Sequence, residues 1–342
     1  MPEPRFLVVR LSSLGDIVHT FPAVAALRES FPNSEIVWLT HPRWESLVES
    51  SQLTTEIWPA ETRSFRSIRP IVRRIREKKF SIAIDYQGLW KSAALPFFGG
   101  TQRRIGFSSQ TVREFGVPVL YTDRVHSTAA HIVAQNGELS LRAGAHNGVG
   151  KVMLSVPFVQ EAFVLQLLRG FSIERYVVLS PGGGWRSKCW PPDRFGALCQ
   201  KIRDGLGLRC VLNFGPVEDA LVAAVKTASG KAEPVPYNGS LPQLMALLRN
   251  AACVVGGDTG PLHLAVALGA PSVALFGPTD PARNGPFRSS DSSMPCHKLD
   301  TVIRKAGAVT TYERGDQPDS SLLKISVDEV FEAVRQHIEA RR

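Results

Sequence analysis

Short apolar segments alternate with helical patterns along the whole chain, and this alternation restricts the possible fold most strongly. Parallel strands need a crossover connection, usually a helix, so strands and helices in alternation favour parallel sheets covered by helices. The apolar segments read as buried strands are, in order, Phe6–Val9, Glu35–Leu39, Ser81–Asp85, Tyr176–Ser180, Cys210–Phe214, Cys253–Gly256 and Ser272–Phe276. We therefore predict an α/β protein.

The strands form two series, which we assign to two domains. At 342 residues the chain is long enough for two cores, and a weakly patterned stretch at 143–150 separates the series. We predict Rossmann-like domains over residues 1–155 and 156–342, with a final helix at 327–341 packing on either one. Two such sheets facing each other would leave a cleft lined by the loops at the carboxyl ends of the strands.

Composition narrows the cellular location and the chemistry. No segment approaches the roughly 20 apolar residues that span a bilayer, and the N-terminus lacks a signal-peptide pattern, so we expect a cytoplasmic protein. The five cysteines show neither a CxxC pair nor zinc-ligand spacing, which predicts reduced thiols and no metal site. Cys189 lies beside Lys188, and we predict a packing role for it.

The charge of the chain predicts an anionic partner. The net charge is +9, which suits nucleic acid, a membrane surface or a phosphorylated substrate. Between Arg63 and Lys79 there are eight basic residues and one acid, Glu77, the strongest local field in the chain. Part of this run is expected to be a solvated helix face.

The polar loop at 11–16 directly follows the first predicted strand, where open α/β proteins place reactive groups. Its Asp16 is therefore a candidate general base. An aspartate before a helix also commonly caps that helix by accepting backbone N–H bonds. Thr20 and Pro22 suit the start of the main helix better, and both roles of Asp16 stay open.

A glycine-rich loop after the Tyr176–Ser180 segment is a candidate anion site. Its backbone amides could cradle phosphate while Arg186 and Lys188 neutralise charge. It matches neither a P-loop nor the G-x-G-x-x-G pattern, because no glycine precedes Lys188 and Ser187 holds the third glycine position. The alternative is a plain turn in which glycines permit a positive φ.

A second glycine-rich loop, at 256–263, again joins a strand to a helix. Free amides of Thr259 and Gly260 at the helix start would help to hold a diphosphate. Alternatively, Asp258 and Thr259 only cap the helix, and His263 is a satisfied interior histidine.

Two further features follow strands of the second series. The turn at 277–281 closes the last of these strands. Glu218 could accept ribose hydroxyls, as the acidic residue of nucleotide-binding α/β units does, or it could be a solvated glutamate of a first helical turn.

Five ordered segments together resemble the lipopolysaccharide heptosyltransferases, which are inverting enzymes of the GT-B fold that use ADP-heptose. The segments are Arg10–Thr20, Asp85–Ala93, Ser187–Pro191, Asp258–His263 and Gly277–Pro281. Asp85–Ala93 looks most like heptosyltransferase I, which adds the first heptose to the Kdo sugars on lipid A.

The resemblance implies a nucleotide-sugar donor site in the second domain and an anionic Kdo-lipid A acceptor site in the first. Asp16 matches the catalytic base, and Lys188 matches a diphosphate contact that acts without a metal or other cofactor. The implied donor-binding residues are Gly183, Gly184, Ser187, Lys188, Glu218, Asp258, Thr259, Gly260 and His263. The implied acceptor-binding residues are Ser13, Gly15, Arg63, Arg66, Lys91 and Arg113. The resemblance also implies work at the cytoplasmic face of the inner membrane, without an obligate protein partner.

One departure from the family concerns the residues before the donor-loop lysine. Some members carry hydroxyl side chains there, whereas this chain has glycine at 182–184, so backbone amides would replace those contacts. Three alternatives stay open. They are heptosyltransferase II or another GT-B transferase, a nucleotide-sugar-binding regulator without turnover, and a nucleic-acid-binding protein, which the absence of a recognised motif disfavours.

Overall fold

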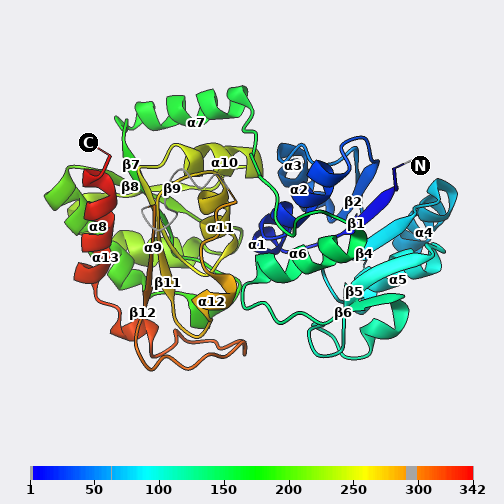
Figure 1. Ribbon diagram of the computed structural model, residues 1–342. Helices are drawn as coiled ribbons and strands as arrows, with labels where there is room; N and C mark the ends of the chain where they lie inside the picture. The colour runs from blue at the N-terminus through cyan, green and yellow to red at the C-terminus, as the bar shows by residue number, and fades with distance from the viewer. Residues whose placement is uncertain (1–2, 63, 290–298, 342) are drawn as a thin grey trace. The chain divides into compact units, whose positions relative to one another are not determined.

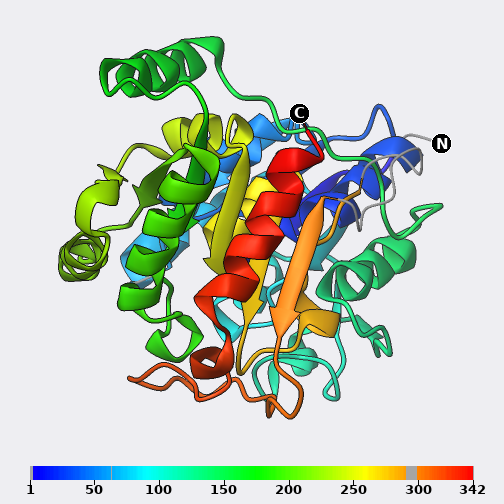
Figure 2. The same ribbon diagram turned by 90° about the vertical axis from the view of Figure 1, so that its left-hand side faces the viewer.

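The computed structural model describes residues 3–62, 64–289 and 299–341 (Figures 1 and 2). Arg63, predicted to bind the acceptor, and Cys296 lie outside the described residues. The chain divides into two compact units. One is built on Met1–Ser155, and the other on Val156–Arg288 with the C-terminal part of the chain.

The N-terminal unit is built around a six-stranded parallel sheet, in which β1 pairs with β2 on one side and with β4 on the other. Every residue of β1 is buried, as expected for a strand flanked by parallel neighbours. In sheet order the strands are β3 (Glu56–Pro59), β2 (Ile36–Thr40), β1 (Phe6–Val9), β4 (Ile82–Asp85), β5 (Arg103–Phe107) and β6 (Asp123–Val125).

Helices cover both faces of this sheet. Successive residues of a strand point to opposite faces, so the apolar strands have side chains to bury on both sides. Leu7 and Val9 pack in one cluster with Ile75 of α4 and Leu95 of α5. On the other face, Phe21 of α2 packs against Trp38 of β2, and α6 packs on α2. The helices are α1 (Leu14–Val18), α2 (Phe21–Ser30), η1 (Pro42–Trp44), α3 (Glu45–Ser50), α4 (Phe65–Lys78), α5 (Trp90–Phe98), η2 (Val117–Leu120) and α6 (Ile132–Ala143).

The C-terminal unit holds a second parallel sheet of six strands, with β10 and β7 at its centre. In sheet order the strands are β12 (Asp300–Arg304), β11 (Ser272–Phe276), β10 (Cys253–Gly257), β7 (Tyr176–Ser180), β8 (Arg209–Asn213) and β9 (Val235–Tyr237). The helices are α7 (Phe158–Gly170), η3 (Arg186–Lys188), α8 (Pro192–Leu206), α9 (Asp219–Ala228), η4 (Gly230–Ala232), α10 (Leu241–Arg249), α11 (Gly260–Ala267), α12 (Pro281–Asn284), η6 (Leu322–Lys324) and α13 (Val327–Glu339).

The final helix, α13, packs on the C-terminal unit, where it contacts α8, β10 and β11 (Figure 2). Val330 and Val334 on its buried face join the same core cluster as Val255 of β10. The predicted α/β class is confirmed by the two parallel sheets. Within the described residues, no helix is long and apolar enough to cross a membrane.

Candidate active site

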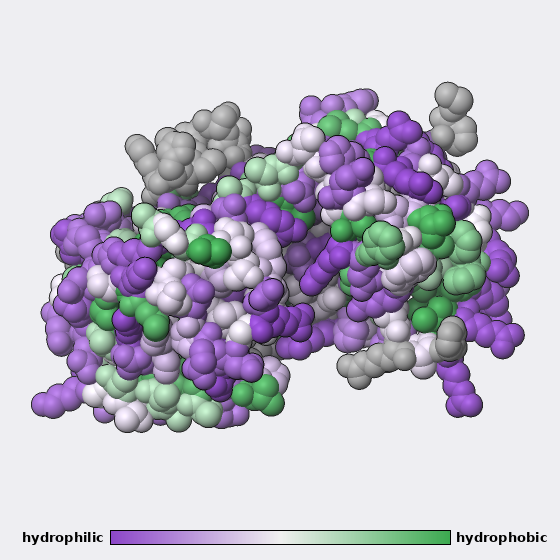
Figure 3. Space-filling view, turned by 90° about the horizontal axis from the view of Figure 1, so that it is seen from below, coloured by the Kyte–Doolittle hydropathy of each residue, from purple (hydrophilic) through white to green (hydrophobic). Residues whose placement is uncertain are grey.

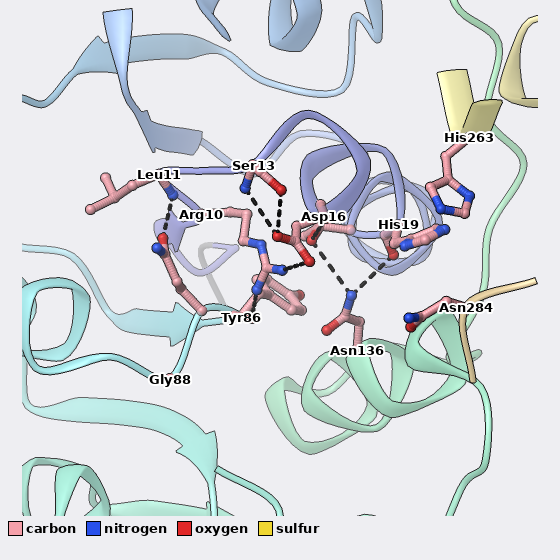
Figure 4. Close-up of polar contacts among 12 residues, drawn as sticks. Arg10, Leu11, Ser13, Asp16, His19, Tyr86, Gly88, Asn136, His263 and Asn284 are labelled. Atoms are coloured by element: carbon pink, nitrogen blue, oxygen red, sulfur yellow. Dashed lines mark hydrogen bonds and ion pairs between the residues drawn. The ribbon is translucent and has the colours of Figure 1, made fainter. Parts of the chain in front are cut away.

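Asp16 lies just beyond the carboxyl end of β1, in the first turn of α1, where several donors hold its carboxylate (Figure 4). The backbone N–H and the hydroxyl of Ser13 donate to Oδ2 at 3.1 Å and 2.8 Å. Nη2 of Arg10 lies 2.8 Å from Oδ1. Asp16 thus caps α1 through a capping box with Ser13. This does not exclude chemistry, because Oδ2 accepts both Ser13 donors, whereas Oδ1, which faces Arg10, keeps a second lone pair.

Arg10, which no sequence motif marks as a site residue, is fixed by the neighbouring strands. Its side chain is 6% exposed, and its guanidinium donates to the carbonyl oxygen of Tyr86 after β4. Trp38 Nε1 donates to the Arg10 carbonyl at 3.1 Å, and the Leu11 N–H donates to Gln87 Oε1 at 2.7 Å. The loops after β1 and β4 therefore form one hydrogen-bonded assembly.

These contacts set the charge of Asp16. Burial raises its pKa, but Arg10 and the two Ser13 donors outweigh burial and hold the pKa well below the usual range of an aspartate. The carboxylate is therefore ionised at neutral pH, which is the state that a general base needs.

Asp85 organises the loop that supports Arg10. Its buried carboxylate accepts hydrogen bonds from the backbone N–H groups of Gln87 and Gly88 and from the hydroxyls of Ser92 and Tyr121. Burial raises the pKa of Asp85 despite these donors. This network gives the Asp85–Ala93 segment a structural reason for its residue pattern.

The predicted acceptor residues divide into two groups. Ser13 and Gly15 lie in the Asp16 turn itself. Lys91 lies in the first turn of α5, and Arg113 lies in a segment whose Glu114 N–H donates to the Gly88 carbonyl, so both adjoin the loop after β4. Arg66 lies in the first turn of α4, and no contact within the described chain joins it to this loop.

Part of the basic run is used inside the fold. Arg74 stacks 3.8 Å over the Trp58 ring and pairs with Glu56, and Lys78 also pairs with Glu56, at 2.8 Å. Arg73 pairs with Glu77 at 3.2 Å. Arg74 and Lys78 are thus used within the fold, and the exposure of Arg66, Arg69 and Arg73 confirms that part of the run is a solvated helix face.

The C-terminal unit contains a second polar cluster, centred on Asp258 after β10. Lys188 Nζ lies 2.8 Å from Asp258 Oδ2, and His263 Nε2 lies 2.9 Å from Oδ1. Asn284 Nδ2 also donates to Oδ2, at 3.3 Å. Burial raises the pKa of Asp258, but His263 and Lys188 outweigh it and hold the pKa far below its usual range.

Because of this cluster, neither Asp258 nor Thr259 caps helix α11 with its side chain. Asp258 does not cap α11, because its carboxylate is taken by Lys188, His263 and Asn284. Thr259 occupies the N-cap position of α11 without a side-chain capping bond, so within the described chain no side chain caps this helix start. The amides of the first turn, including that of Gly260, are therefore available to an anion.

Two of the three glycines of the donor loop, Gly182 and Gly183, serve close packing, whereas a Cβ on Gly184 would have no atom within 4 Å. Gly182, Gly183 and Gly184 all lack a positive φ, so the plain-turn alternative does not explain them. A Cβ on Gly182 would lie 2.1 Å from Glu218 Oε1, and one on Gly183 would lie 3.0 Å from the Thr259 methyl group. The loop thus runs directly between Glu218 and the start of α11.

Glu218 is anchored beside this loop. Its Oε2 accepts the Gly215 N–H at 2.7 Å, and the side chain is only partly exposed. It occupies the N-cap position of α9 without making a capping bond there, because its carboxylate accepts the N–H of the preceding loop.

Two other residues of the donor loop have structural partners. Ser187 is buried, and its hydroxyl accepts the Gly315 N–H at 3.4 Å, which ties the loop to a segment near the C-terminus. Burial raises the pKa of the Cys189 thiol to about 11, so the thiol is protonated at neutral pH. Within the described chain, no group of three His, Cys, Asp or Glu residues could hold a metal ion.

The close approach of Gly182 to Glu218 can be tested by substitution. Gly182→Ala should displace the Glu218 carboxylate and weaken ADP binding about tenfold, the effect of losing a hydrogen bond to a charged group. Calorimetric titration with ADP measures this, and Glu218→Gln should show a similar loss. Gly170→Ala, with no atom within 4 Å of the new Cβ, is the matched control. Unchanged ADP affinity in Gly182→Ala would remove Glu218 from the donor site.

Comparisons with known proteins show the family of the chain. The family described as glycosyltransferase family 9 (heptosyltransferase) matches residues 68–304. Lipopolysaccharide heptosyltransferase 1 of Salmonella typhimurium is 28% identical over 326 residues, which are 90% of this chain and 98% of the relative. The protein of the same name from Pseudomonas aeruginosa is 27% identical over 312 residues, 85% of each chain.

Solved structures share the fold. A glycosyltransferase of family 9 from Veillonella parvula superposes with a TM-score of 0.83 at 19% identity and covers 99% of both chains. The E. coli heptosyltransferase WaaC with ADP superposes with a TM-score of 0.75 at 23% identity, covering 97% of this chain and 99% of that one. Two parallel sheets of this kind, shared with these structures, show the GT-B fold. The chain belongs to glycosyltransferase family 9, the heptosyltransferase family, and is an enzyme.

Proposed function

We propose that this enzyme transfers heptose from ADP-heptose to a Kdo sugar of Kdo-lipid A, with inversion at the anomeric carbon. The observation that carries the proposal is the similarity to proteins named lipopolysaccharide heptosyltransferase 1, which extends over most of both chains. The Asp16 loop and the Asp258 cluster supply the two chemical functions that the reaction needs.

Asp16 acts as the general base in this proposal. Its ionised carboxylate takes the proton of the Kdo hydroxyl as that oxygen forms a bond to the anomeric carbon. Arg10 and Ser13 hold the carboxylate in one orientation, at 2.8 Å and 2.8–3.1 Å. Fixed orientation is itself a large part of catalytic power, because it removes the entropy cost of aligning the reacting groups.

The leaving ADP is stabilised from the C-terminal unit. Lys188 supplies a positive charge, and the uncapped first turn of α11 supplies amides that point at the diphosphate. Charge builds on the leaving oxygen in the transition state, so fixed donors lower the barrier without a bound metal. Glu218, beside the glycine loop, accepts the ribose hydroxyls.

The acceptor is anionic and carried in a bilayer, so the N-terminal unit binds it with cations and works at the cytoplasmic face of the inner membrane. Ser13, Gly15, Lys91 and Arg113 lie in or beside the Asp16 assembly, which suits contacts to Kdo carboxylates. Arg66 would contact a more distant part of the acceptor.

A direct test incubates the purified protein with ADP-heptose and Kdo-lipid A and follows ADP release and the mass of the lipid. We expect a gain of one heptose. A panel of other nucleotide sugars, and an acceptor that already carries one heptose, separates this function from heptosyltransferase II and from other GT-B transferases. Release of ADP only with the heptosylated acceptor would identify a second-heptose enzyme and contradict the proposal.

A further inference from the structure

The outer surface of α4, α5 and the segment around η2 combines exposed aromatic rings with unpaired cations. These elements are contiguous: α4 packs on α5, and α5 packs on η2. Arg76 Nη2 of α4 donates to the Phe98 carbonyl at the end of α5, at 2.9 Å. We call this surface, formed by residues 66–79, 90–98 and 113–119, the docking face.

The apolar part of the docking face projects into solvent. Phe98 is 60% exposed and Phe115 is 95% exposed, although burial of either ring would be favourable. Trp90 and Phe97 on α5 and Val119 on η2 are also exposed. The Phe115 segment lies against α5, because a Cβ on Gly116 would be 3.0 Å from the Trp90 ring.

The charged part of the docking face is almost entirely positive. The face holds two acids: Glu77 of α4, which pairs with Arg73 at 3.2 Å, and Glu114, which accepts the Trp90 N–H at 2.8 Å; helix α5 contains none. Arg66, Arg69, Lys79, Lys91 and Arg113 are exposed, and their side chains make no ion pair with the described part of the chain. Figure 3 shows green hydrophobic side chains bordered by purple hydrophilic ones on the face that it views.

We propose that the docking face binds the surface of an anionic lipid bilayer. Aromatic rings are enriched at membrane interfaces, and each lysine or arginine near an anionic leaflet strengthens binding about fivefold. The exposed rings of Phe98 and Phe115 suit insertion among head groups and acyl chains better than stacking on nucleic-acid bases, which needs rings that lie flat on a groove. The proposal deepens the membrane location in the proposed function by naming the surface that makes the contact.

The test measures co-sedimentation of the full-length protein with vesicles, without donor or acceptor. We expect binding to vesicles of phosphatidylcholine and phosphatidylglycerol, weaker binding at high salt, and little binding to phosphatidylcholine alone. Phe98→Ser/Phe115→Ser should lower the partition coefficient about tenfold. Arg69→Gln/Lys79→Gln should lower it by a similar factor. Thermal melting checks that each variant is folded.

The C-terminal unit offers matched controls. Phe158 and Phe163 of α7 are exposed aromatic residues on a helix with few charges, so Phe158→Ser/Phe163→Ser should leave vesicle binding unchanged. Arg169→Gln/Arg249→Gln controls for the loss of two exposed charges. Equal losses in the control and docking-face variants would overturn the proposal.

Other partners give distinct results. A protein that binds a duplex oligonucleotide, or that dimerises through Phe98 and Phe115, while leaving anionic vesicles unbound would overturn the proposal. The activity readout separates docking from chemistry. Phe98→Ser/Phe115→Ser should keep the parental rate on a deacylated, water-soluble acceptor and lose rate only on the vesicle-borne acceptor. Vesicle binding without any heptose transfer would refute the proposed function and leave the docking face intact.

Discussion

Replacing Asp16 with asparagine is expected to slow heptose transfer at least ~100-fold while ADP-heptose binds nearly as well as to the parent. The exchange keeps the size of the side chain and its acceptor oxygen for the Ser13 N–H, but it removes the basic oxygen that would take the proton. The donor contacts proposed here all lie in the C-terminal unit, so donor affinity should not fall. Single-turnover rates and titration with ADP-heptose measure the two quantities separately.

The capping role of Asp16 requires a control for stability. Ser13→Ala removes the hydroxyl that donates to Oδ2 at 2.8 Å but leaves the carboxylate and its pairing with Arg10. If Asp16 served only as a helix cap, Asp16→Asn and Ser13→Ala would both lower the stability of the protein. The folded fraction of each variant would then transfer heptose at the parental rate. Near-parental turnover in Asp16→Asn, with full donor affinity, would assign Asp16 to capping alone.

The central strands could be predicted from sequence because parallel neighbours bury them on both faces. Phe6–Val9, Tyr176–Ser180 and Ser272–Phe276 have the bounds that their apolar runs predict. The strands that the pattern missed lie at or next to a sheet edge, such as β6 (Asp-Arg-Val) and β12 (Asp-Thr-Val-Ile-Arg), where neither is fully buried. A strand with polar, partly exposed residues has no continuous apolar run to reveal it.

The sequence was enough to locate the loops of the candidate site, but not to show which side chains of these loops pair with each other. The glycine-rich loops and the Asp16 turn follow strands, and the rule for strand ends located them. The partner of Asp16, Arg10, is six residues earlier in the chain, and the partner of Lys188, Asp258, is 70 residues later. The Lys188–Asp258 pair depends on β7 and β10 lying side by side in the sheet, an order that one sequence does not specify. The same is true of Gly182, whose need to be glycine arises from Glu218.

The pairing of Lys188 with Asp258 shapes the prediction for the donor diphosphate. Lys188→Ala should lower kcat/KM for ADP-heptose on the order of 100-fold, with losses in both donor affinity and kcat. Affinity falls because the diphosphate is anionic before reaction, and kcat falls because further charge develops on the leaving oxygen. The KM for the acceptor should change little. Lys201→Ala, which removes an exposed lysine paired with Asp328 on the same unit, is the matched control.

Asp258 contributes to the expected effect of removing Lys188. Without the lysine, the Asp258 carboxylate, which is 5% exposed, keeps only His263 and Asn284 as partners. That negative charge would repel the donor diphosphate. Part of the loss in Lys188→Ala should therefore come from Asp258, and Lys188→Ala/Asp258→Asn should bind ADP-heptose more tightly than the single variant. Activity should stay above zero in both, since the amides at the start of α11 are untouched. Titration with ADP-heptose across the parent, both single variants and the double variant gives the coupling between the two residues. If Lys188→Ala keeps parental donor affinity and turnover, the glycine-rich loop does not bind the diphosphate, and the pair serves only to join η3 to β10.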